Sequence, residues 1–320
     1  MRIVFMGTPD FALPSLQTLV DGDHEVVGVV TQPDRPGGRG LKLNRPPVKR
    51  LAEQIGVPIL QPERLKSRSF REELGAWQAD LFVVVAFRIL PVSILAIPPK
   101  GSVNLHASLL PKYRGAAPIQ WAIVNGEHET GVTTFFLDRD VDTGSILMQQ
   151  PTPIGPDETG GQLHDRMMKE GAVLLGATVD AIGTGVAKSL RQEGESTSAP
   201  KLLKADGLLD WTQSAKTLHN RIRGLNPYPM AFTHRGDKTL RVLSSRLSGS
   251  DAEAGGRLPG EILTVEGSQG IRVQTGHGSL LITELQPEGK KRMAAEAFVR
   301  GYRMAAGDRL GRVSMSQEES

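Results

Sequence analysis

The 320-residue sequence contains no cysteine, so disulfides and thiolate metal sites are excluded. Aromatic residues make up only 5% of it, and no apolar run approaches the roughly 18 residues of a membrane span. It also lacks the G-x-G-x-x-G and Gly-Lys-Thr patterns that bind dinucleotides and nucleotide phosphates. With 39% hydrophobic and 23% charged residues, we expect a globular protein of one or two domains. The absence of cysteine fits a reducing cytoplasm, which is the location we expect.

What the sequence does contain, in its first half, is a series of apolar runs separated by helical patterns. The runs at 2–6, 26–30 and 81–86 predict strands, because β-branched residues dominate them. Thr8 is expected to cap the helix between the first two, with Pro9 as its first residue. Strands apolar on both faces, joined through helices, are typical of parallel sheets. We therefore predict an α/β domain, a Rossmann-like, mostly parallel sheet with helices on both faces.

The composition changes after about residue 183. Glycine, serine and proline are frequent up to Pro200, which predicts a linker. Short strand-like runs separated by glycines follow, and their regular spacing predicts a small β-barrel. The expected division is a catalytic domain at 1–187, a linker at 188–205, a barrel at 206–312 and a frayed tail at 313–320.

A polar cluster is expected where the strand at 102–105 ends. Asn104 and His106 stand at that end, and Asp142 follows 36 positions later in a loop rich in turn-forming residues. Open α/β sheets bind ligands beyond the carboxyl ends of their strands, so these side chains are candidates for a site. Taken alone, Asn-x-His at a strand end is better explained by a packed histidine, since lone polar pairs are common there. A metal site at His106 and Asp142 is disfavoured, since no third ligand is evident.

Further residues carry a resemblance to a known family. Asn104, His106 with Ser108-Leu109-Leu110-Pro111, and Asp142-Thr143-Gly144 resemble the folate-dependent formyltransferase family. The resemblance implies transfer of a formyl group from 10-formyltetrahydrofolate to an amine, and an OB-like C-terminal domain. Asn104 and His106 would donate hydrogen bonds to the formyl oxygen as negative charge develops there. His106 would carry the proton from the amine to the leaving nitrogen, and Asp142 would hold its imidazole.

The folate site implied by the resemblance involves the segment after the strand at 81–86. Its commoner form in the family is Ala-Tyr-Gly-x-Ile-Leu-Pro; here Phe87 replaces the tyrosine and the segment is one residue shorter. Considered without the family, Phe87 is a core residue, and Arg88 lies at the surface or binds the folate glutamate tail, with the surface favoured. The expected folate-binding residues are Phe87, Arg88, Ile89, Leu90, Ser108, Leu109, Leu110, Pro111, Asp138 and Asp140.

Residues 31–48 form a basic stretch rich in proline and glycine, which predicts neither helix nor strand. The run 31–40 is similar to the branch of the family whose acceptor is the methionyl initiator tRNA, and it implies that this loop contacts the acceptor stem. The C-terminal part suits the same partner: residues 201–320 hold 18 Lys+Arg against 13 Asp+Glu. Solvated surface charge is the alternative explanation of both features. The expected tRNA-binding residues are Arg39, Lys42, Arg114, Lys201 and Lys204.

Two other functions are compatible with parts of this pattern. A small-molecule formyltransferase or formyl-folate hydrolase, for example one acting on an amino sugar nucleotide, would use the same Asn104, His106 and Asp142. A non-enzymatic RNA- or folate-binding module would not need them. We expect a monomer without a membrane partner.

Overall fold

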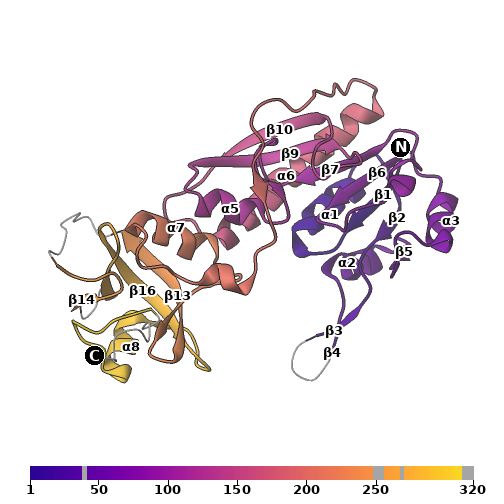
Figure 1. Ribbon diagram of the computed structural model, residues 1–320. Helices are drawn as coiled ribbons and strands as arrows, with labels where there is room; N and C mark the ends of the chain where they lie inside the picture. Colours follow the sequence, from indigo (N-terminus) through magenta and orange to yellow (C-terminus); the bar gives the residue numbers. More distant parts are fainter. Residues whose placement is uncertain (38–41, 248–255, 267–269, 312–320) are drawn as a thin grey trace. The chain divides into compact units, whose positions relative to one another are not determined.

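The computed structural model describes residues 1–37, 42–247, 256–266 and 270–311, so the expected tail at 313–320 lies outside the described residues. The chain divides into two compact units (Figure 1). The first unit holds Met1–Pro118, Glu129–Pro153 and His164–Pro200, and the second holds Ile119–His128, Ile154–Leu163 and the chain from Lys201 onward. Each unit therefore combines segments that are far apart in the sequence.

A seven-stranded sheet in the order β10-β9-β7-β6-β1-β2-β5 forms the centre of the first unit (Figure 1). Its strands are β1 (Arg2–Gly7), β2 (Glu25–Val30), β5 (Ile59–Leu60), β6 (Leu81–Val85), β7 (Ser102–His106), β9 (Glu129–Phe136) and β10 (Ile146–Pro153). β9 runs antiparallel to both β7 and β10, and all other neighbours pair in parallel. The carboxyl ends of β1, β2, β6 and β7 consequently lie at one edge of the sheet.

Helices cover both faces of this sheet, which confirms the predicted α/β architecture. They are α1 (Leu13–Asp21), α2 (Pro47–Ile55), α3 (Arg68–Ala76), α4 (Val92–Leu95) and the part of α6 (Gly160–Gly183) from His164 onward. The first residues of α6, and α5 (Pro118–Val124) from Ile119 onward, belong to the second unit. Phe70 and Leu74 of α3 lie in one buried cluster with Val84 of β6. Leu105 of β7 faces the other way, where Gly171 of α6 leaves room for its side chain. No helix within the described ranges has the length and hydropathy of a membrane span.

The first helix begins differently from the prediction. A 3-10 turn, η1 (Asp10–Ala12), precedes α1, and its N-cap is Pro9. The prediction that Thr8 caps the helix is wrong, because the Thr8 hydroxyl has no hydrogen-bond partner among the described residues. The Asp10 carboxylate instead accepts from the amide of Phe11 at 3.0 Å.

The basic stretch at 31–48 contains two short strands, contrary to the prediction. β3 (Arg35–Gly37) and β4 (Lys42–Asn44) pair antiparallel, with Arg35 opposite Asn44. A two-stranded ladder leaves every strand at an edge, where a proline without an N–H donor is tolerated. Pro36 therefore did not exclude a strand. The loop that joins them lies outside the described residues.

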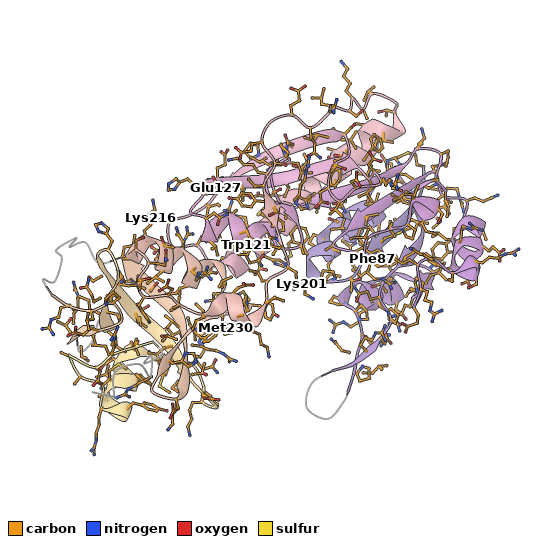
Figure 2. All side chains as sticks on the ribbon, viewed as in Figure 1. Phe87, Trp121, Glu127, Lys201, Lys216 and Met230 are labelled. Atoms are coloured by element: carbon orange, nitrogen blue, oxygen red, sulfur yellow. The ribbon has the colours of Figure 1, made fainter. Side chains whose placement is uncertain are left out.

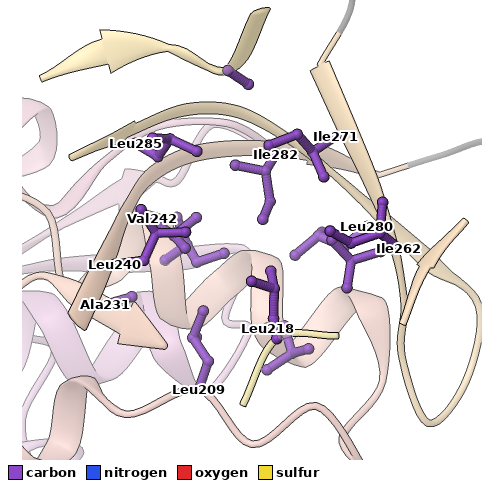
Figure 3. Packing of buried hydrophobic residues seen from close by; sticks show 14 of the residues in the cluster. Leu209, Leu218, Ala231, Leu240, Val242, Ile262, Ile271, Leu280, Ile282 and Leu285 are labelled. Atoms are coloured by element: carbon purple, nitrogen blue, oxygen red, sulfur yellow. The ribbon is translucent and has the colours of Figure 1, made fainter. Parts of the chain in front are cut away.

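An antiparallel sheet in the order β12-β13-β16-β15-β14, with β17 paired to β16, forms the barrel-like body of the second unit. Its elements are η2 (Lys204–Gly207), α7 (Ala215–Gly224), β12 (Ala231–Arg235), β13 (Lys238–Leu247), β14 (Ile262–Glu266), β15 (Gly270–Gln274), β16 (Ser279–Pro287), β17 (Met293–Ala294) and α8 (Ala295–Tyr302). Leu218 of α7 points into the hollow of the sheet, toward a core that includes Val242 and Ile282 (Figure 3). The short β-rich elements predicted for this region are thus confirmed, with β12 and β17 added to them.

Candidate active site

The candidate site is built on the last residues of β7. Successive side chains of a strand point to opposite faces, so Asn104 and His106 share one face and Leu105 faces α6. Asn104 pairs in register with Val84 of β6 and with Phe135 of β9. The site therefore lies on the face of the sheet that α3 covers, at the carboxyl end of a central strand.

Both ring nitrogens of His106 have an oxygen nearby. Nε2 lies 2.9 Å from the carbonyl oxygen of Tyr113, and Nδ1 lies 3.7 Å from the Oδ2 of Asp142. The ring is buried, and the Phe135 ring stands edge-on to it at 6.5 Å between centroids. A carbonyl oxygen can only accept, so Nε2 carries the hydrogen in this bond. Nδ1 is left as the nitrogen that can gain or lose a proton.

Asp142 reaches His106 from a loop that turns back along the sheet. β9 ends at Phe136, which pairs with Val103 near the start of β7, and not with His106. The loop must therefore return along β7 before its carboxylate can contact the imidazole. Asp142 has a φ of 56°, and its Oδ2 accepts from the backbone amide of Gly115 at 2.8 Å. A backbone donor thus fixes the carboxylate beside the imidazole.

Gly144 allows the loop to close onto β9. A Cβ at this position would lie 1.7 Å from the carbonyl oxygen of Phe136, which no side chain can accommodate. The Phe136 amide in turn donates to the carbonyl oxygen of Ser145 at 3.0 Å. The Asp-Thr-Gly pattern at 142–144 therefore has a local structural reason: the aspartate enters the site because the glycine lets the chain turn.

Asn104 is half-buried, and its amide has no hydrogen-bond partner in the part of the chain that the structure describes. Most polar side chains in half-buried positions are hydrogen-bonded, because a donor that is removed from water without a partner costs free energy. An unpaired amide two residues from His106, on the same face of β7, is available to a ligand oxygen.

The Ser108–Pro111 turn is held rigidly against β9. The Ser108 hydroxyl donates to the carbonyl of Lys112 at 2.6 Å, and the Thr133 hydroxyl donates to the carbonyl of Ser108 at 2.6 Å. The Leu110 amide donates to the same Thr133 hydroxyl at 3.2 Å. The Ser108 side chain is therefore committed to the turn itself, and the peptide between Leu110 and Pro111 is cis.

The segment after β6 lies next to the end of β7, since Val85 pairs with Leu105. Ile89 is 76% exposed, whereas Leu90 is buried and Phe87 packs against the α3 cluster (Figure 2). An exposed isoleucine beside two apolar neighbours offers a surface to a flat apolar ligand.

Arg88 is only partly buried, and its guanidinium is bound to backbone carbonyls, a contact that the sequence did not predict. Its guanidinium donates to the carbonyl oxygens of Pro62 at 2.7 Å and Glu63 at 3.2 Å, and it lies 5.4 Å from the centroid of the Phe87 ring. Partial burial lowers the pKa of the Arg88 guanidinium from its usual value. These two hydrogen bonds tie the Arg88 side chain to the backbone of the segment that follows β5.

The remaining predicted residues are spread more widely. Asp138 and Asp140 are exposed in the loop that carries Asp142, and the Asp138 carboxylate accepts from the amide of Arg139. Lys201, which Figure 2 labels, and Lys204 are both exposed and belong to the second unit. Arg39 lies outside the described residues, as does the side chain of Lys42.

Arg114 has a partner that sequence reasoning missed. Its Nε and one terminal nitrogen donate to Oε1 of Gln192 at 3.2 and 2.6 Å. The other end of Gln192 donates from Nε2 to the carbonyls of Asp142 at 2.8 Å and Gly144 at 2.9 Å. Gln192 lies in the stretch predicted as a linker, and no motif marks it as part of a site.

No group of three or more histidine, cysteine or acidic side chains that could hold a metal ion occurs among the described residues. The site thus consists of an unpaired amide, an imidazole held by a carbonyl and a carboxylate, and an exposed apolar segment. This arrangement defines a class of protein that can stabilise charge on a carbonyl oxygen and move a proton without a covalent intermediate.

Comparison with known proteins identifies the family. Residues 1–179 match the family model described as formyl transferase, and residues 201–303 match that of the formyl transferase C-terminal domain. The chain belongs to the formyl transferase family.

Similar proteins include the methionyl-tRNA formyltransferases of Trichlorobacter lovleyi and Moorella thermoacetica. The first is 50% identical over 311 residues, which cover 97% of this chain and 96% of the relative. The second is 50% identical over 313 residues, with 97% and 99% covered. Among solved structures, the sugar 3N-formyl transferase WlaRD superposes with a TM-score of 0.67 over 91% of this chain and 99% of its own. Its sequence is only 19% identical, so this likeness shows the fold.

Proposed function

We propose that this chain transfers the formyl group of 10-formyltetrahydrofolate to the amino group of methionyl initiator tRNA. The observation that carries the proposal is the pairing of His106 with Asp142, beside an unpaired Asn104 amide. Relatives at 50% identity over almost their whole length, all named for this reaction, support the choice of acceptor.

Each of the three residues has a distinct part in the proposed chemistry. The Asn104 amide donates to the formyl oxygen as negative charge develops there, an interaction stronger in the transition state than in the bound substrate. His106 Nδ1 takes the proton that the attacking amine must lose and returns it to the leaving nitrogen. The Asp142 carboxylate stabilises the imidazolium in between, while the Tyr113 carbonyl holds the ring in place.

The folate donor is proposed to lie against the segment after β6. A pterin ring is flat, with apolar faces and a hydrogen-bonding edge, so it suits an exposed apolar side chain flanked by backbone groups. Ile89 supplies the former. The remaining proposed folate-binding residues are Phe87, Arg88, Leu90, Ser108, Leu109, Leu110, Pro111, Asp138 and Asp140.

The tRNA is proposed to contact basic residues of both units. Arg39 and Lys42 lie in the basic loop, and Lys201 and Lys204 lie at the beginning of the second unit's C-terminal segment. Arg114 remains a proposed contact, although its Nε and one terminal nitrogen already bind Gln192. The proposed division into a catalytic domain at 1–187, a linker at 188–205 and a tRNA-supporting barrel at 206–312 assigns chemistry and polyanion binding to different segments. The protein is proposed to act as a monomer in the cytoplasm.

The proposal is tested by transfer of labelled formyl from 10-formyltetrahydrofolate to methionyl-tRNA. We expect efficient transfer to the initiator tRNA and none to free methionine or to an amino sugar nucleotide. The Arg39→Ala variant is expected to raise KM for the tRNA, and the exposed Lys66→Ala serves as its matched control. Preferred transfer to the sugar nucleotide, or release of formate without an acceptor, would support the small-molecule or hydrolase alternative instead.

A further inference from the structure

The stretch between Leu190 and Ala199 contacts the chain on both sides of the His106–Asp142 pair. On one side, Leu190 exchanges two backbone hydrogen bonds with Ile146, at 2.7 and 2.8 Å. On the other side, β11 (Ser198–Ala199) pairs in parallel with β8 (Arg114–Gly115). A segment whose composition is typical of a linker is therefore built into the first unit beside its site.

Gln192, near the beginning of this stretch, uses both of its side-chain N–H groups in hydrogen bonds. Its two N–H groups meet the carbonyls of Asp142 and Gly144, one each, at 2.8 and 2.9 Å. Its oxygen accepts from the guanidinium of Arg114. Arg114 immediately precedes Gly115, whose amide donates to the Asp142 carboxylate. One side chain thus joins the backbone of Asp142 to the strand that holds its carboxylate.

The other partner of His106 is held by the same stretch. The Tyr113 carbonyl binds His106 Nε2, and the Tyr113 amide donates to the Thr197 hydroxyl at 2.8 Å. The Arg114 amide donates to the carbonyl of Thr197 at 2.9 Å. The contacts that orient the imidazole on both of its nitrogens therefore depend on residues 190–199.

From this geometry we infer that Gln192 is a positioning residue of formyl transfer, acting through Asp142. Asp142 has a positive φ in a loop that returns along β7, so its place is set by tertiary contacts and not by the strand. Gln192 fixes the Asp142–Gly144 turn so that Oδ2 faces His106 Nδ1. The inference rests on the proposed function, and it predicts a loss in the chemical step and not in binding of the folate.

The test compares kcat and KM of the full-length protein and two variants. Gln192→Met keeps the shape but removes every hydrogen bond; Gln192→Glu keeps the acceptor for Arg114 but sets a carboxylate against two carbonyl oxygens. Misplacement by about 1 Å can cost about a hundredfold, so we expect kcat to fall ten- to a hundredfold in both, with KM for 10-formyltetrahydrofolate within about twofold. Glu193→Ala, at an exposed neighbour, is the control and is expected to behave as the wild type.

A double-mutant cycle separates positioning from a general structural role. If Gln192 acts through Asp142, Gln192→Met should lower the single-turnover rate less than about twofold further in an Asp142→Asn background. Equal losses in both backgrounds, or variants of Gln192 with the kcat of Glu193→Ala, would overturn the inference. Thermal unfolding of each variant shows whether the fold is kept. If Gln192→Met does not fold, the kinetics of Gln192→Glu, which retains its Arg114 contact, test the inference instead. A wild type that transfers no formyl group would instead refute the proposed function.

Discussion

The side-chain amide of Asn104 is available to a ligand because of the position of this residue on β7. The strand fixes its backbone by register with β6 and β9, and its side chain shares a face with His106 while making no hydrogen bond among the described residues. A donor held in this way needs no rearrangement when charge develops on a ligand oxygen, which is the condition for strong electrostatic catalysis.

Replacement of Asn104 by alanine should therefore lower kcat more than it changes KM. Loss of one such donor typically costs a hundred- to a thousandfold in kcat, about 2.7–4 kcal/mol. Steady-state kinetics with 10-formyltetrahydrofolate and methionyl-tRNA measure this, and the exposed Gln78→Ala is expected to match the wild type. A variant of Asn104 that keeps the wild-type kcat would remove it from the proposed mechanism.

His219 in the second unit is a buried histidine with a different environment. It lies on α7, with Nδ1 3.1 Å from the Ser245 hydroxyl and Nε2 3.2 Å from the Pro156 carbonyl. Burial lowers its pKa from the usual 6.5, while the bond to Pro156 raises it, the Arg223 charge lowers it and the Asp157 carboxylate raises it. The neutral ring satisfies both partners, donating to the carbonyl and accepting from the hydroxyl.

The lowered pKa of His219 makes stability depend on pH. Below pH 6.5 the unfolded chain binds a proton at this residue that the folded chain does not, so folding is opposed as the pH falls. We expect Tm to decrease as the pH falls below about 6.5, until the pH reaches the lowered pKa of His219 in the folded state. In His219→Gln the decrease should be smaller. Thermal unfolding between pH 5 and 7.5 tests this, with the exposed His277→Gln as control. Equal pH dependence in both variants would contradict the assignment.

At the scale of elements, the short pairing of β8 with β11 depends on Gly115. Its φ is 124°, and a Cβ there would lie 2.6 Å from the carbonyl oxygen of Ala199. Its amide is also the donor that fixes the Asp142 carboxylate. Only glycine fits here, because other residues rarely adopt a φ of this value and would bring a Cβ against the Ala199 carbonyl.

The Gly115→Ala variant should lose both stability and activity. Backbone strain of this kind costs about 1–3 kcal/mol, and the contact with Ala199 adds to it, so Tm should fall together with kcat. Gly75→Ala provides the matched control: a Cβ there meets no atom within 4 Å and the position is helical, so Tm should rise slightly. An unchanged Tm in Gly115→Ala would show that β8 and β11 contribute nothing to the fold.

The sequence predicted elements best where one pattern decides them. β6 at Leu81–Val85 follows from an uninterrupted apolar run, and the residues of the His106–Asp142 pair were found through a family motif. Prediction from the sequence failed where tertiary contacts decide the local structure. β3 forms in spite of Pro36, since its partner β4 leaves it at an edge. Gln192 was missed because a glycine- and serine-rich stretch has the composition of a linker whether or not the fold uses it.

At the scale of the whole molecule, chemistry and charge are separated along the chain. Residues 1–200, with His106 and Asp142, hold 20 Lys+Arg against 22 Asp+Glu, whereas residues 201–320 have a surplus of five positive charges. This separation predicts that charge changes in the second unit alter tRNA binding without altering the chemical step.

Lys201 and Lys204 offer a direct test, because both are exposed in the second unit. Each Lys contact with a phosphate releases counterions, and the slope of log affinity against log salt changes by about 0.7–0.9 per contact. In the variant with both lysines replaced by alanine, we expect KM for methionyl-tRNA to rise and its salt dependence to weaken by about one to two units of slope. KM for 10-formyltetrahydrofolate should stay the same. Lys66→Ala, an exposed lysine of the first unit, is the control, and an identical slope in both variants would place the tRNA elsewhere.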